Sequence, residues 1–349
     1  MFMRKNNKAP QRILFLYYDP HFAHAAFAKS INADFRPAPK IRSGEESITK
    51  NMKWGMQSIG AIFTLPRNYG TYFCEGTYVF PAIATKLGLL PKKAKIINIL
   101  ASPLLYYIKT GKIKGIKKWL ALKMLEEVDS FVCLGKMEQD ILKEFIPNAK
   151  SVVVYPFIRP KTYNKLIKLK DIFPKLDSHT ILTIGTGDVY YKGIDLLIKA
   201  FKIAKEKIPS LKLNIVGKFD EEIYELADGI DGITVKGYVG DLVKEIKNAA
   251  LYIHMGRGDT FPVSTLEAML GGLPVIVSET TGIKEIIPEN NKEMVVSLSP
   301  KRLAKRMFWY FGLTNEEKKR ISKQFILIGS KYNIEACVKD FKRSYEMVL

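Results

Sequence analysis

Residues 258–274 read GDTFPVSTLEAMLGGLP, and a β-like run, Val275–Val277, follows directly. This stretch places two carboxylates, Asp259 and Glu267, eight positions apart, with a short apolar step and a helix start between them. A helix start offers unpaired backbone N–H groups and the positive end of a dipole, so it suits a phosphate. A carboxylate one turn into such a helix accepts hydrogen bonds from sugar hydroxyls. Phosphate and sugar hydroxyls together indicate a nucleotide ligand.

A purely structural interpretation of the same stretch stays open. Ser264 as the N-cap and Glu267 as the third helical residue would form a capping box. Asp259 beside Gly258 would be a turn former. Each of these residues, taken singly, fits this interpretation at least as well as it fits a ligand site.

The rest of the chain alternates short apolar runs with amphipathic helical stretches, which predicts α/β layers around parallel sheets. A helix is expected over Gly193–Ile208, where apolar residues recur at helical spacing. We therefore predict two doubly wound, Rossmann-like domains over residues 1–157 and 158–330, and a C-terminal helix in 331–349 that packs back towards the first domain. The basic stretch 161–175 is expected at the boundary. The expected strands are Arg12–Tyr18, Ala61–Leu65, Tyr72–Glu75, Ala94–Ala101, Ser130–Leu134, Ser151–Tyr155, Thr180–Gly185, Leu211–Val216, Gly232–Lys236, Ala250–His254 and Pro274–Ser278.

The loops after the strands of such domains gather at the carboxyl edge of each sheet, where ligands bind. Two of these edges facing each other would define an interdomain cleft. The loop Gly185–Gly193 follows a predicted strand and opens a helix, and Lys192 sits where it reaches anionic oxygens at the helix start. Its glycine spacing matches neither the phosphate loop of nucleoside triphosphatases nor the dinucleotide fingerprint.

Together, the motifs of the second half resemble those of the C-terminal domain of the retaining nucleotide-sugar glycosyltransferases of family 4, which have the GT-B fold. The resemblance covers residues 180–290, and the first half matches only loosely. It implies a hexosyltransferase-like enzyme that moves a sugar from a nucleotide diphosphate sugar to a hydroxyl acceptor. The first domain would face the acceptor and the second would bind the donor. The motifs are Lys192–Asp195, Ile215–Gly217, Gly237–Val239, Asp259–Glu267 and Thr281–Glu285.

The resemblance implies a role for each matching residue. Lys192 would hold the donor diphosphate, Glu267 would accept hydrogen bonds from the ribose, and Asp259 would lie near the hydroxyls of the transferred sugar. Lys192 and Asp259 would thus take part in catalysis. The other donor-binding positions are Gly187, then Gly217 and Tyr238 flanking the base and ribose, and the amides around Val263, Ser264 and Thr265 at the distal phosphate and the sugar.

Two positions depart from the family pattern. Asp259 stands where the family usually has a glutamate, and we expect the contact to survive because the charge is kept. Thr186 stands where the family usually has an arginine, so a bidentate phosphate clamp is missing. Arg257 or Lys218 would be the substitute.

The sequence has no Asp-x-Asp pair and no cluster of His, Cys and carboxylates at metal-ligand spacing. We therefore expect no cofactor and no metal, with Lys192 and helix amides neutralising the diphosphate. In the mechanism that the resemblance implies, the nucleotide diphosphate leaves and the acceptor hydroxyl attacks from the same face of the sugar. The departing phosphate would take the acceptor proton.

Polar residues follow the first predicted strand in the half expected to bind the acceptor. Asp19, His21 and His24 come directly after it, and Glu75 ends another predicted strand. Asp19, His24 and Glu75 would contact the acceptor, and His21 would assist proton transfer. A histidine near a helix start is commonly structural, so that interpretation stays open as well.

The formal net charge is +20, and residues 1–157 alone hold 24 Lys and Arg against 11 Asp and Glu. Such an excess attracts polyanions, although an ordinary solvated surface explains it equally well. Two stretches, Tyr106–Lys123 and Met52–Phe63, combine apolar and aromatic residues with lysines and would suit an anionic membrane surface. We expect a glycan or lipid-linked acceptor. Because no nucleic-acid recognition motif is present, we do not expect a nucleic-acid partner.

Three scattered cysteines and a polar, basic N-terminus predict a cytoplasmic protein, docked at most peripherally on the inner face of the membrane. Two other functions remain open from the sequence. One is a non-catalytic sugar-nucleotide-binding protein, which Thr186 and the first-half loop allow. The other is a glycosyltransferase that acts on nucleic acid.

Overall fold

The structure of the chain is a computed structural model that describes residues 12–17, 21–37, 60, 62–77, 79–91 and 93–349. Its contacts divide the chain into two units. One unit combines Met1–Val154 with Val338–Leu349, and the other is Tyr155–Cys337. Each unit contains its own six-stranded sheet.

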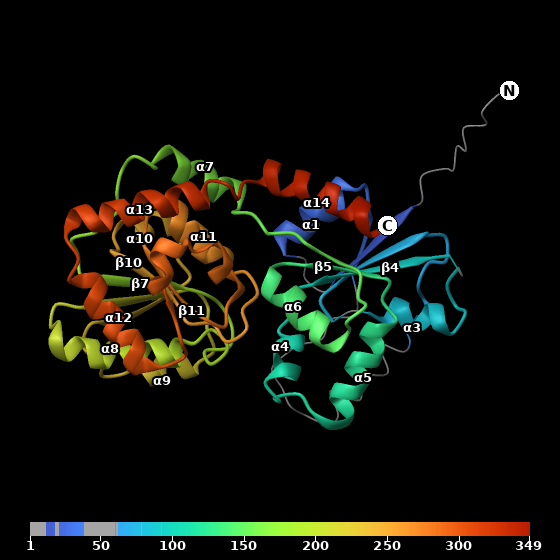
Figure 1. Cartoon of the computed structure of the whole chain (residues 1–349), viewed down its shortest axis with the longest axis horizontal. Helices are drawn as coiled ribbons and strands as arrows, with labels where there is room; N and C mark the ends of the chain where they lie inside the picture. The colour runs from blue at the N-terminus through green and yellow to red at the C-terminus, as the bar shows by residue number, and fades with distance from the viewer. Residues whose placement is uncertain (1–11, 18–20, 38–59, 61, 78, 92) are drawn as a thin grey trace. The chain divides into compact units, whose positions relative to one another are not determined.

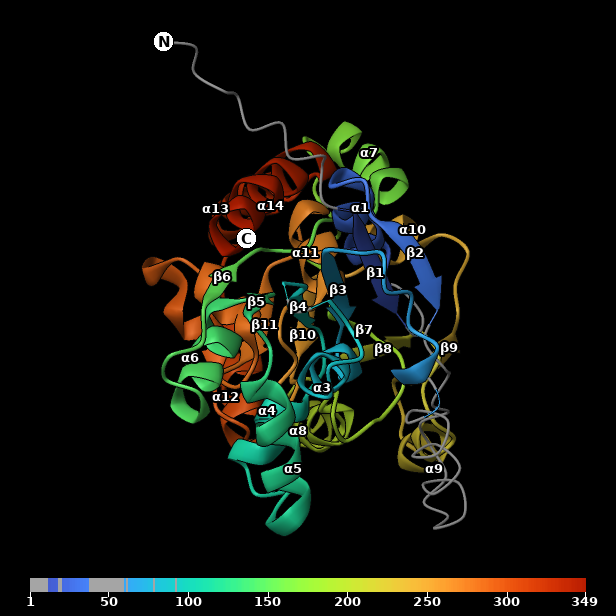
Figure 2. The ribbon, with the colours of Figure 1, turned by 90° about the vertical axis from the view of Figure 1, so that its right-hand side faces the viewer.

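The first unit is a parallel sheet of order β2-β1-β3-β4-β5-β6, and the strand labels of Figure 2 follow this order. The chain steps outward from β1 to β2 and then returns to the other side of β1, so α1 covers one face and α3 to α6 cover the other (Figure 1). The strands are β1 (Ile13–Tyr17), β2 (Asp34–Pro37), β3 (Thr71–Glu75), β4 (Lys95–Leu100), β5 (Ser130–Cys133) and β6 (Ser151–Val153). The helices are α1 (Phe22–Ser30), α3 (Phe80–Lys86), α4 (Leu104–Lys109), α5 (Gly115–Glu126) and α6 (Lys136–Phe145).

The last helix of the chain, α14 (Ile334–Val348), completes the core of the first unit. Its Phe341 ring stacks on Phe27 of α1 with the centroids 4.7 Å apart. At its end, the Ser130 hydroxyl donates a hydrogen bond of 2.8 Å to the backbone oxygen of Val348. The helix therefore covers the same face as α1, although hundreds of residues separate the two.

The strand predicted over Ala61–Leu65 is wrong, because Ile62 and Phe63 are helical. Ile62 and Leu65 are buried while Phe63 is 62% exposed. Buried residues three positions apart follow the period of a helix rather than the alternation of a strand. The neighbouring stretch expected to meet a membrane, Met52–Phe63, lies almost entirely outside the described residues.

The second unit has a parallel sheet of order β12-β11-β10-β7-β8-β9. In Figure 1, α8, α9 and α12 lie over one face and α7, α10, α11 and α13 over the other. The strands are β7 (Thr180–Ile184), β8 (Lys212–Val216), β9 (Ile233–Gly237), β10 (Leu251–His254), β11 (Val275–Ser278) and β12 (Val295–Val296). The helices are α7 (Pro160–Lys168), α8 (Ile194–Lys207), α9 (Glu222–Ala227), α10 (Leu242–Lys247), α11 (Val263–Leu270), η1 (Gly282–Ile286), η2 (Glu289–Met294), α12 (Pro300–Phe311) and α13 (Asn315–Gly329).

The basic stretch expected at the domain boundary belongs to the second unit. Most of it forms α7, whose Leu166 is fully buried in the core of that unit. Tyr163 of the same helix donates a hydrogen bond of 2.9 Å to the backbone oxygen of Ser330. The buried leucine and the partly buried tyrosine anchor this otherwise basic helix to the second unit.

Each sheet reverses its strand order at one point, between β1 and β3 in the first unit and between β7 and β10 in the second. The crossover helices on either side of such a point lie on opposite faces of the sheet. The loops beyond the carboxyl ends of the two strands therefore diverge and leave room for a ligand.

Candidate functional site

In the second unit, a lysine and a carboxylate meet at the point where the strand order reverses. Lys192 comes from the loop after β7 and Asp259 from the loop after β10, and Nζ lies 2.6 Å from Oδ2. The two side chains are 21% and 12% exposed. Burial opposes ionisation of Asp259, but Lys192 and His254 outweigh it and hold the pKa of this carboxyl well below its usual range. Asp259 is therefore a buried anion.

A second ion pair ties the same two loops together. Arg257 makes a bidentate contact with Asp195 of α8, at 2.7 and 2.9 Å, and its guanidinium lies 3.9 Å from the centroid of the Tyr190 ring. An arginine whose guanidinium makes these contacts is not available to bind the phosphates of a ligand. Arg257 is thus engaged elsewhere and does not replace the arginine missing at Thr186, whereas Lys218 is exposed beside the loop.

The start of α11 is fixed by side chains of the sheet. The Ser264 hydroxyl donates to the backbone oxygen of Ile184 at 3.2 Å and contacts the Tyr252 hydroxyl at 3.0 Å. The N-cap is Pro262, which makes no side-chain cap. The capping box considered from the sequence is therefore not formed, because Ser264 lies inside the helix and turns towards β7. The N–H of Thr265 donates to the backbone oxygen of Pro262 at 3.1 Å, so the amides of Val263 and Ser264 are the ones left at the carboxyl edge of the sheet, where they suit an anion.

Glu267 lies one turn into α11 and is only 7% exposed. No hydrogen bond to its carboxyl group is found among the described residues. Burial raises the pKa of Glu267 to about 7, and the charge of Arg159 opposes this rise. A buried carboxyl group without protein donors is suited to receive hydroxyl groups from a ligand.

Two glycines bring the backbone of this edge together. Gly193 has φ +70°, and a Cβ there would lie 1.9 Å from the backbone oxygen of Met255. Gly217 has φ +122°, and a Cβ there would lie 1.7 Å from the backbone oxygen of Gly185. Only glycine fits at either position. The loops after β7, β8 and β10 are thereby held in contact.

The remaining donor-side residues differ in their placement. Gly187 has φ +83° and its N–H donates to the Lys218 oxygen at 2.8 Å, so it belongs to this cluster of loops. Thr265 is fully buried behind the start of α11 and Val263 is the first residue of that helix. Tyr238 is 87% exposed.

One residue of the cluster was missed from the sequence. His254 is the last residue of β10, is 2% exposed, and places Nε2 3.1 Å from Oδ2 of Asp259. The sequence signal that could have identified His254 is its position at the carboxyl end of a predicted apolar strand. Such a residue reaches the ligand edge of the sheet.

In the first unit, the structure brings together His24 and Glu75. His24 Nδ1 lies 2.5 Å from Oε1 of Glu75, and the two residues are 4% and 7% exposed. The same oxygen accepts a hydrogen bond of 3.3 Å from the backbone N–H of His21. These groups lie between β1 and β3, where the strand order reverses. Asp19, also expected on the acceptor side, lies outside the described residues.

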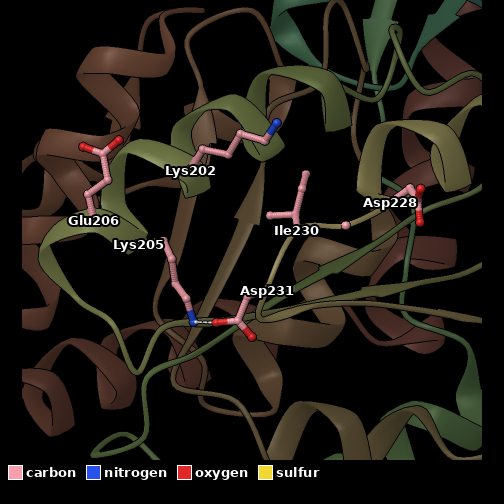
Figure 3. A pocket seen from close by; sticks show the side chains of 7 residues that line it. Lys202, Lys205, Glu206, Asp228, Ile230 and Asp231 are labelled. Carbon is pink, nitrogen blue, oxygen red and sulfur yellow. Dashed lines mark ion pairs between the residues drawn. The ribbon is translucent and has the colours of Figure 1, made fainter.

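A surface hollow lies elsewhere on the second unit (Figure 3). It is lined by the last turns of α8 and by the turn before β9, which is the amino end of that strand. Lys205 is paired there with Asp231 at 2.9 Å. The hollow is therefore at the opposite edge of the sheet from Lys192 and Asp259.

No group of three or more His, Cys, Asp or Glu side chains that could hold a metal ion occurs in the described ranges. Within the same part of the chain, none of the helices has the length and apolarity needed to cross a membrane.

Residues 178–311 match the family model of the glycosyl transferases group 1. An uncharacterized glycosyltransferase of Haemophilus influenzae is 24% identical over 246 residues, which are 66% of this chain and 64% of that protein. A phosphatidyl-myo-inositol mannosyltransferase of Mycolicibacterium smegmatis is 28% identical over 134 residues, which are 37% of this chain and 34% of that protein. The chain thus spans less than two thirds of the length of these relatives.

Among solved structures, Anabaena HepE in complex with UDP-glucose is similar over 97% of this chain and 100% of its own, with a TM-score of 0.70 and 14% sequence identity. An identity this low shows the fold alone. The likeness extends over both units and confirms the predicted pair of doubly wound, Rossmann-like domains.

Proposed function

We infer that this chain, which belongs to the group 1 glycosyl transferases and has the GT-B fold, moves a sugar from a nucleotide diphosphate sugar to a hydroxyl acceptor. The observation that carries the proposal is the cluster at the carboxyl edge of the second sheet. It combines the partly buried pair of Lys192 and Asp259, the start of α11, and the buried carboxyl group of Glu267.

Each part of this cluster suits one part of the donor. Lys192 and the first amides of α11 supply positive charge for a diphosphate. Glu267 offers acceptor oxygens to the ribose hydroxyls, which would supply the hydrogen-bond donors that the protein does not provide. Asp259 lies beside Lys192, where it would accept hydrogen bonds from the transferred sugar. The neighbouring fold of HepE was solved with UDP-glucose, which makes UDP-sugars the first donors to test.

The donor is tested by the thermal stabilisation of the protein with UDP, GDP, ADP and their glucose, mannose and N-acetylglucosamine conjugates. A ligand at 100 times its Kd stabilises the folded state by about 2.7 kcal/mol. Turnover of the stabilising sugar nucleotide should be lost in Lys192→Met and Glu267→Gln. The matched control is Lys202→Met, an exposed lysine of α8 in the hollow at the opposite edge. A protein that no nucleotide stabilises and that turns over no donor would contradict the proposal.

We further propose that the reaction retains the configuration at the anomeric carbon and needs no metal ion. Lys192 and the α11 amides stabilise the leaving diphosphate, and the diphosphate accepts the proton of the attacking hydroxyl. The stereochemistry is tested by NMR of the product formed from an α-linked donor. An α-linked product supports retention, and a β-linked product contradicts it.

The acceptor site is proposed in the first unit, at the carboxyl ends of β1 and β3. Glu75 accepts a hydrogen bond from Nδ1 of His24 and so directs the Nε2 atom of His24 towards an acceptor hydroxyl. Among the described residues, Nε2 of His24 is buried and has no hydrogen-bond partner. His24→Ala should raise the KM for the acceptor and leave the thermal stabilisation by the donor nucleotide unchanged.

We propose that the acceptor is lipid-linked and that α5 meets an anionic membrane surface. Of the twelve residues of α5, only Leu125 is buried. Ile116, Trp119 and Leu120 share one helix face and are 72%, 57% and 48% exposed. Lys117 lies in the first turn of α5 and Lys114 directly precedes the helix; both are exposed and have no ion-pair partner among the described residues. Apolar side chains beside lysines suit an anionic interface, where each lysine contributes on the order of 1 kcal/mol.

Membrane docking is tested by flotation with vesicles of phosphatidylcholine and phosphatidylglycerol. The variant Lys114→Glu/Lys117→Glu/Trp119→Ser should lose flotation. The control Lys319→Glu/Lys323→Glu/Leu327→Ser removes two exposed lysines and a 65% exposed leucine from α13 and should float like the wild type. Equal flotation of both variants would contradict docking through α5.

A further inference from the structure

His254 and Asp259 are held in contact by their backbones. The backbone oxygen of Asp259 accepts hydrogen bonds from the Thr281 hydroxyl at 2.7 Å and from the N–H of Gly282 at 3.0 Å. Between the two residues, the oxygen of Gly256 accepts hydrogen bonds from the hydroxyls of Ser278 and Thr280, at 2.6 and 2.9 Å. The loop that carries the carboxylate is therefore clamped from β11 and the segment after it.

Gly256 allows the histidine ring to lie against Asp259. A Cβ at this position would be 2.6 Å from Nε2 of His254 and 2.9 Å from Cβ of Asp259. A side chain here would separate the two groups. The close approach is thus built into the loop, and the buried imidazole remains beside the carboxylate.

Asp259 has two cationic or donor partners on one oxygen, and they are not equivalent. Lys192 Nζ lies 2.6 Å from Oδ2, whereas His254 Nε2 lies 3.1 Å from it and makes no aligned hydrogen bond with any described residue. Lys192 is also the group proposed to bind the donor diphosphate. When it turns to the diphosphate, Asp259 becomes a buried carboxylate that has lost its ammonium partner, which is costly unless a second donor takes its place.

We propose that His254 is a positioning residue that replaces Lys192 as the hydrogen-bond donor to the Asp259 carboxylate when Lys192 moves to the donor diphosphate. The proposal rests on the donor site proposed above and adds to it a residue outside the sequence motifs. The Nε2–H group of His254 then donates to Oδ2 of Asp259, keeps the carboxylate ionised and aimed at the sugar, and releases Lys192 for the phosphates. The ring acts through Asp259 and touches no part of the donor.

The test is a double-mutant cycle read by the affinity for a nucleoside diphosphate. Wild type, His254→Leu, Asp259→Asn and the double variant are titrated calorimetrically with UDP, and with GDP or ADP if that nucleotide stabilises the wild type more. In the background with Asp259, His254→Leu should weaken binding about 10-fold, because Lys192 stays paired with the carboxylate. In the Asp259→Asn background, the same change should alter Kd less than about 2-fold, because no carboxylate remains to be held.

The outcomes separate this proposal from the donor site itself. A 10-fold loss in both backgrounds would mean that His254 acts by packing, and no loss in either would mean that it does not act; both overturn the inference. A wild-type protein that binds none of the three nucleotides contradicts the donor site instead. His254→Gln, whose amide reaches the carboxylate, should bind within about 3-fold of the wild type.

A measurement on the wild-type chain covers the case in which the leucine variant fails to fold. The chain has four histidines, and His254→Gln identifies the ring signals of His254 in nitrogen-edited NMR spectra. On addition of the nucleotide, the Nε2 proton signal should move downfield as the hydrogen bond to Asp259 shortens. An unchanged signal at saturating nucleotide would overturn the proposal.

Discussion

Replacing Glu267 by glutamine should stabilise the second unit and weaken nucleotide binding. Burial raises the pKa of Glu267 from 4.5 to about 7, so the folded state holds the proton more tightly than the unfolded chain does. For a group whose folded pKa is raised, the stabilisation is full below the unfolded pKa, and it is lost as the pH rises through the folded pKa. The wild type therefore loses stability between pH 4.5 and about pH 7. The glutamine variant has no charge to bury and keeps this stability.

The size of the effect follows from the shift in pKa. One pKa unit corresponds to about 1.4 kcal/mol, so the full cost of ionising Glu267 in the folded state is about 3 kcal/mol. Between pH 5 and pH 8, the difference in unfolding free energy between variant and wild type should widen by about 2.5 kcal/mol. In a domain of this size, that corresponds to a Tm difference of roughly 5–10 °C. Packing differences between the two side chains do not vary with pH and cancel from this comparison.

Differential scanning calorimetry of both proteins at pH 5, 6, 7 and 8 measures the widening directly. The control is Glu206→Gln, an exposed glutamate of α8, whose Tm difference from the wild type should stay constant over the same range. A Glu267→Gln variant that tracks the wild type at every pH would refute the reasoning, because Glu267 would then ionise as freely in the folded state as in the unfolded chain.

Nucleotide binding should change in the opposite sense. The ribose hydroxyls donate to the ionised carboxylate, and a hydrogen bond to a charged group contributes about 1.5–3 kcal/mol. Glu267→Gln should therefore bind the preferred nucleoside diphosphate about 10- to 100-fold more weakly at pH 8. A variant that is more stable and also binds equally well would leave the stability argument intact and remove Glu267 from the proposed donor site.

Three further predictions concern the same unit. Gly193→Ala should lower its unfolding free energy by about 3 kcal/mol or more, because the added Cβ meets the backbone oxygen of Met255 at positive φ; Gly240→Ala, which meets nothing within 4 Å, should be nearly neutral in the same denaturant titration. Lys247→Met should lower the unfolding free energy, measured by urea titration, by about 2 kcal/mol, because Nζ donates to three backbone oxygens that the methionine leaves unpaired. An unchanged urea midpoint would contradict this prediction and show that water replaces the ammonium group. Sugar transfer should proceed at an unchanged rate in excess EDTA, since Lys192 and the helix amides carry the charge of the leaving group; loss of activity that Mg²⁺ or Mn²⁺ restores would contradict this.

Part of the candidate site could be recognised from the sequence because its residues are close along the chain or follow a strand directly. Asp259, Glu267 and Lys192 each sit at a fixed distance from a strand end, and strand ends of a parallel sheet share one edge. His24 was likewise placed after one predicted strand and Glu75 at the end of another, and the two are in contact. Local spacing could not decide that Ser264 turns towards Ile184 and forms no cap. That choice depends on the distant β7, whose carbonyl receives the hydroxyl.

The sequence by itself determined the doubly wound fold, because β-rich apolar runs and helical periodicity alternate along the chain and right-handed crossovers leave few ways to join them. It also determined the glycine-rich turns and the carboxylate pair of residues 258–274. The short strands β2 and β12 could be located only from the tertiary structure, because each forms by pairing with a buried neighbouring strand. It also decided the charge states of the cluster. Asp259 is ionised because Lys192, 67 positions away, lies 2.6 Å from it, and Glu267 resists ionisation because the fold surrounds it without supplying a donor. Burial and the approach of distant charges set these properties, and neither is encoded in local spacing.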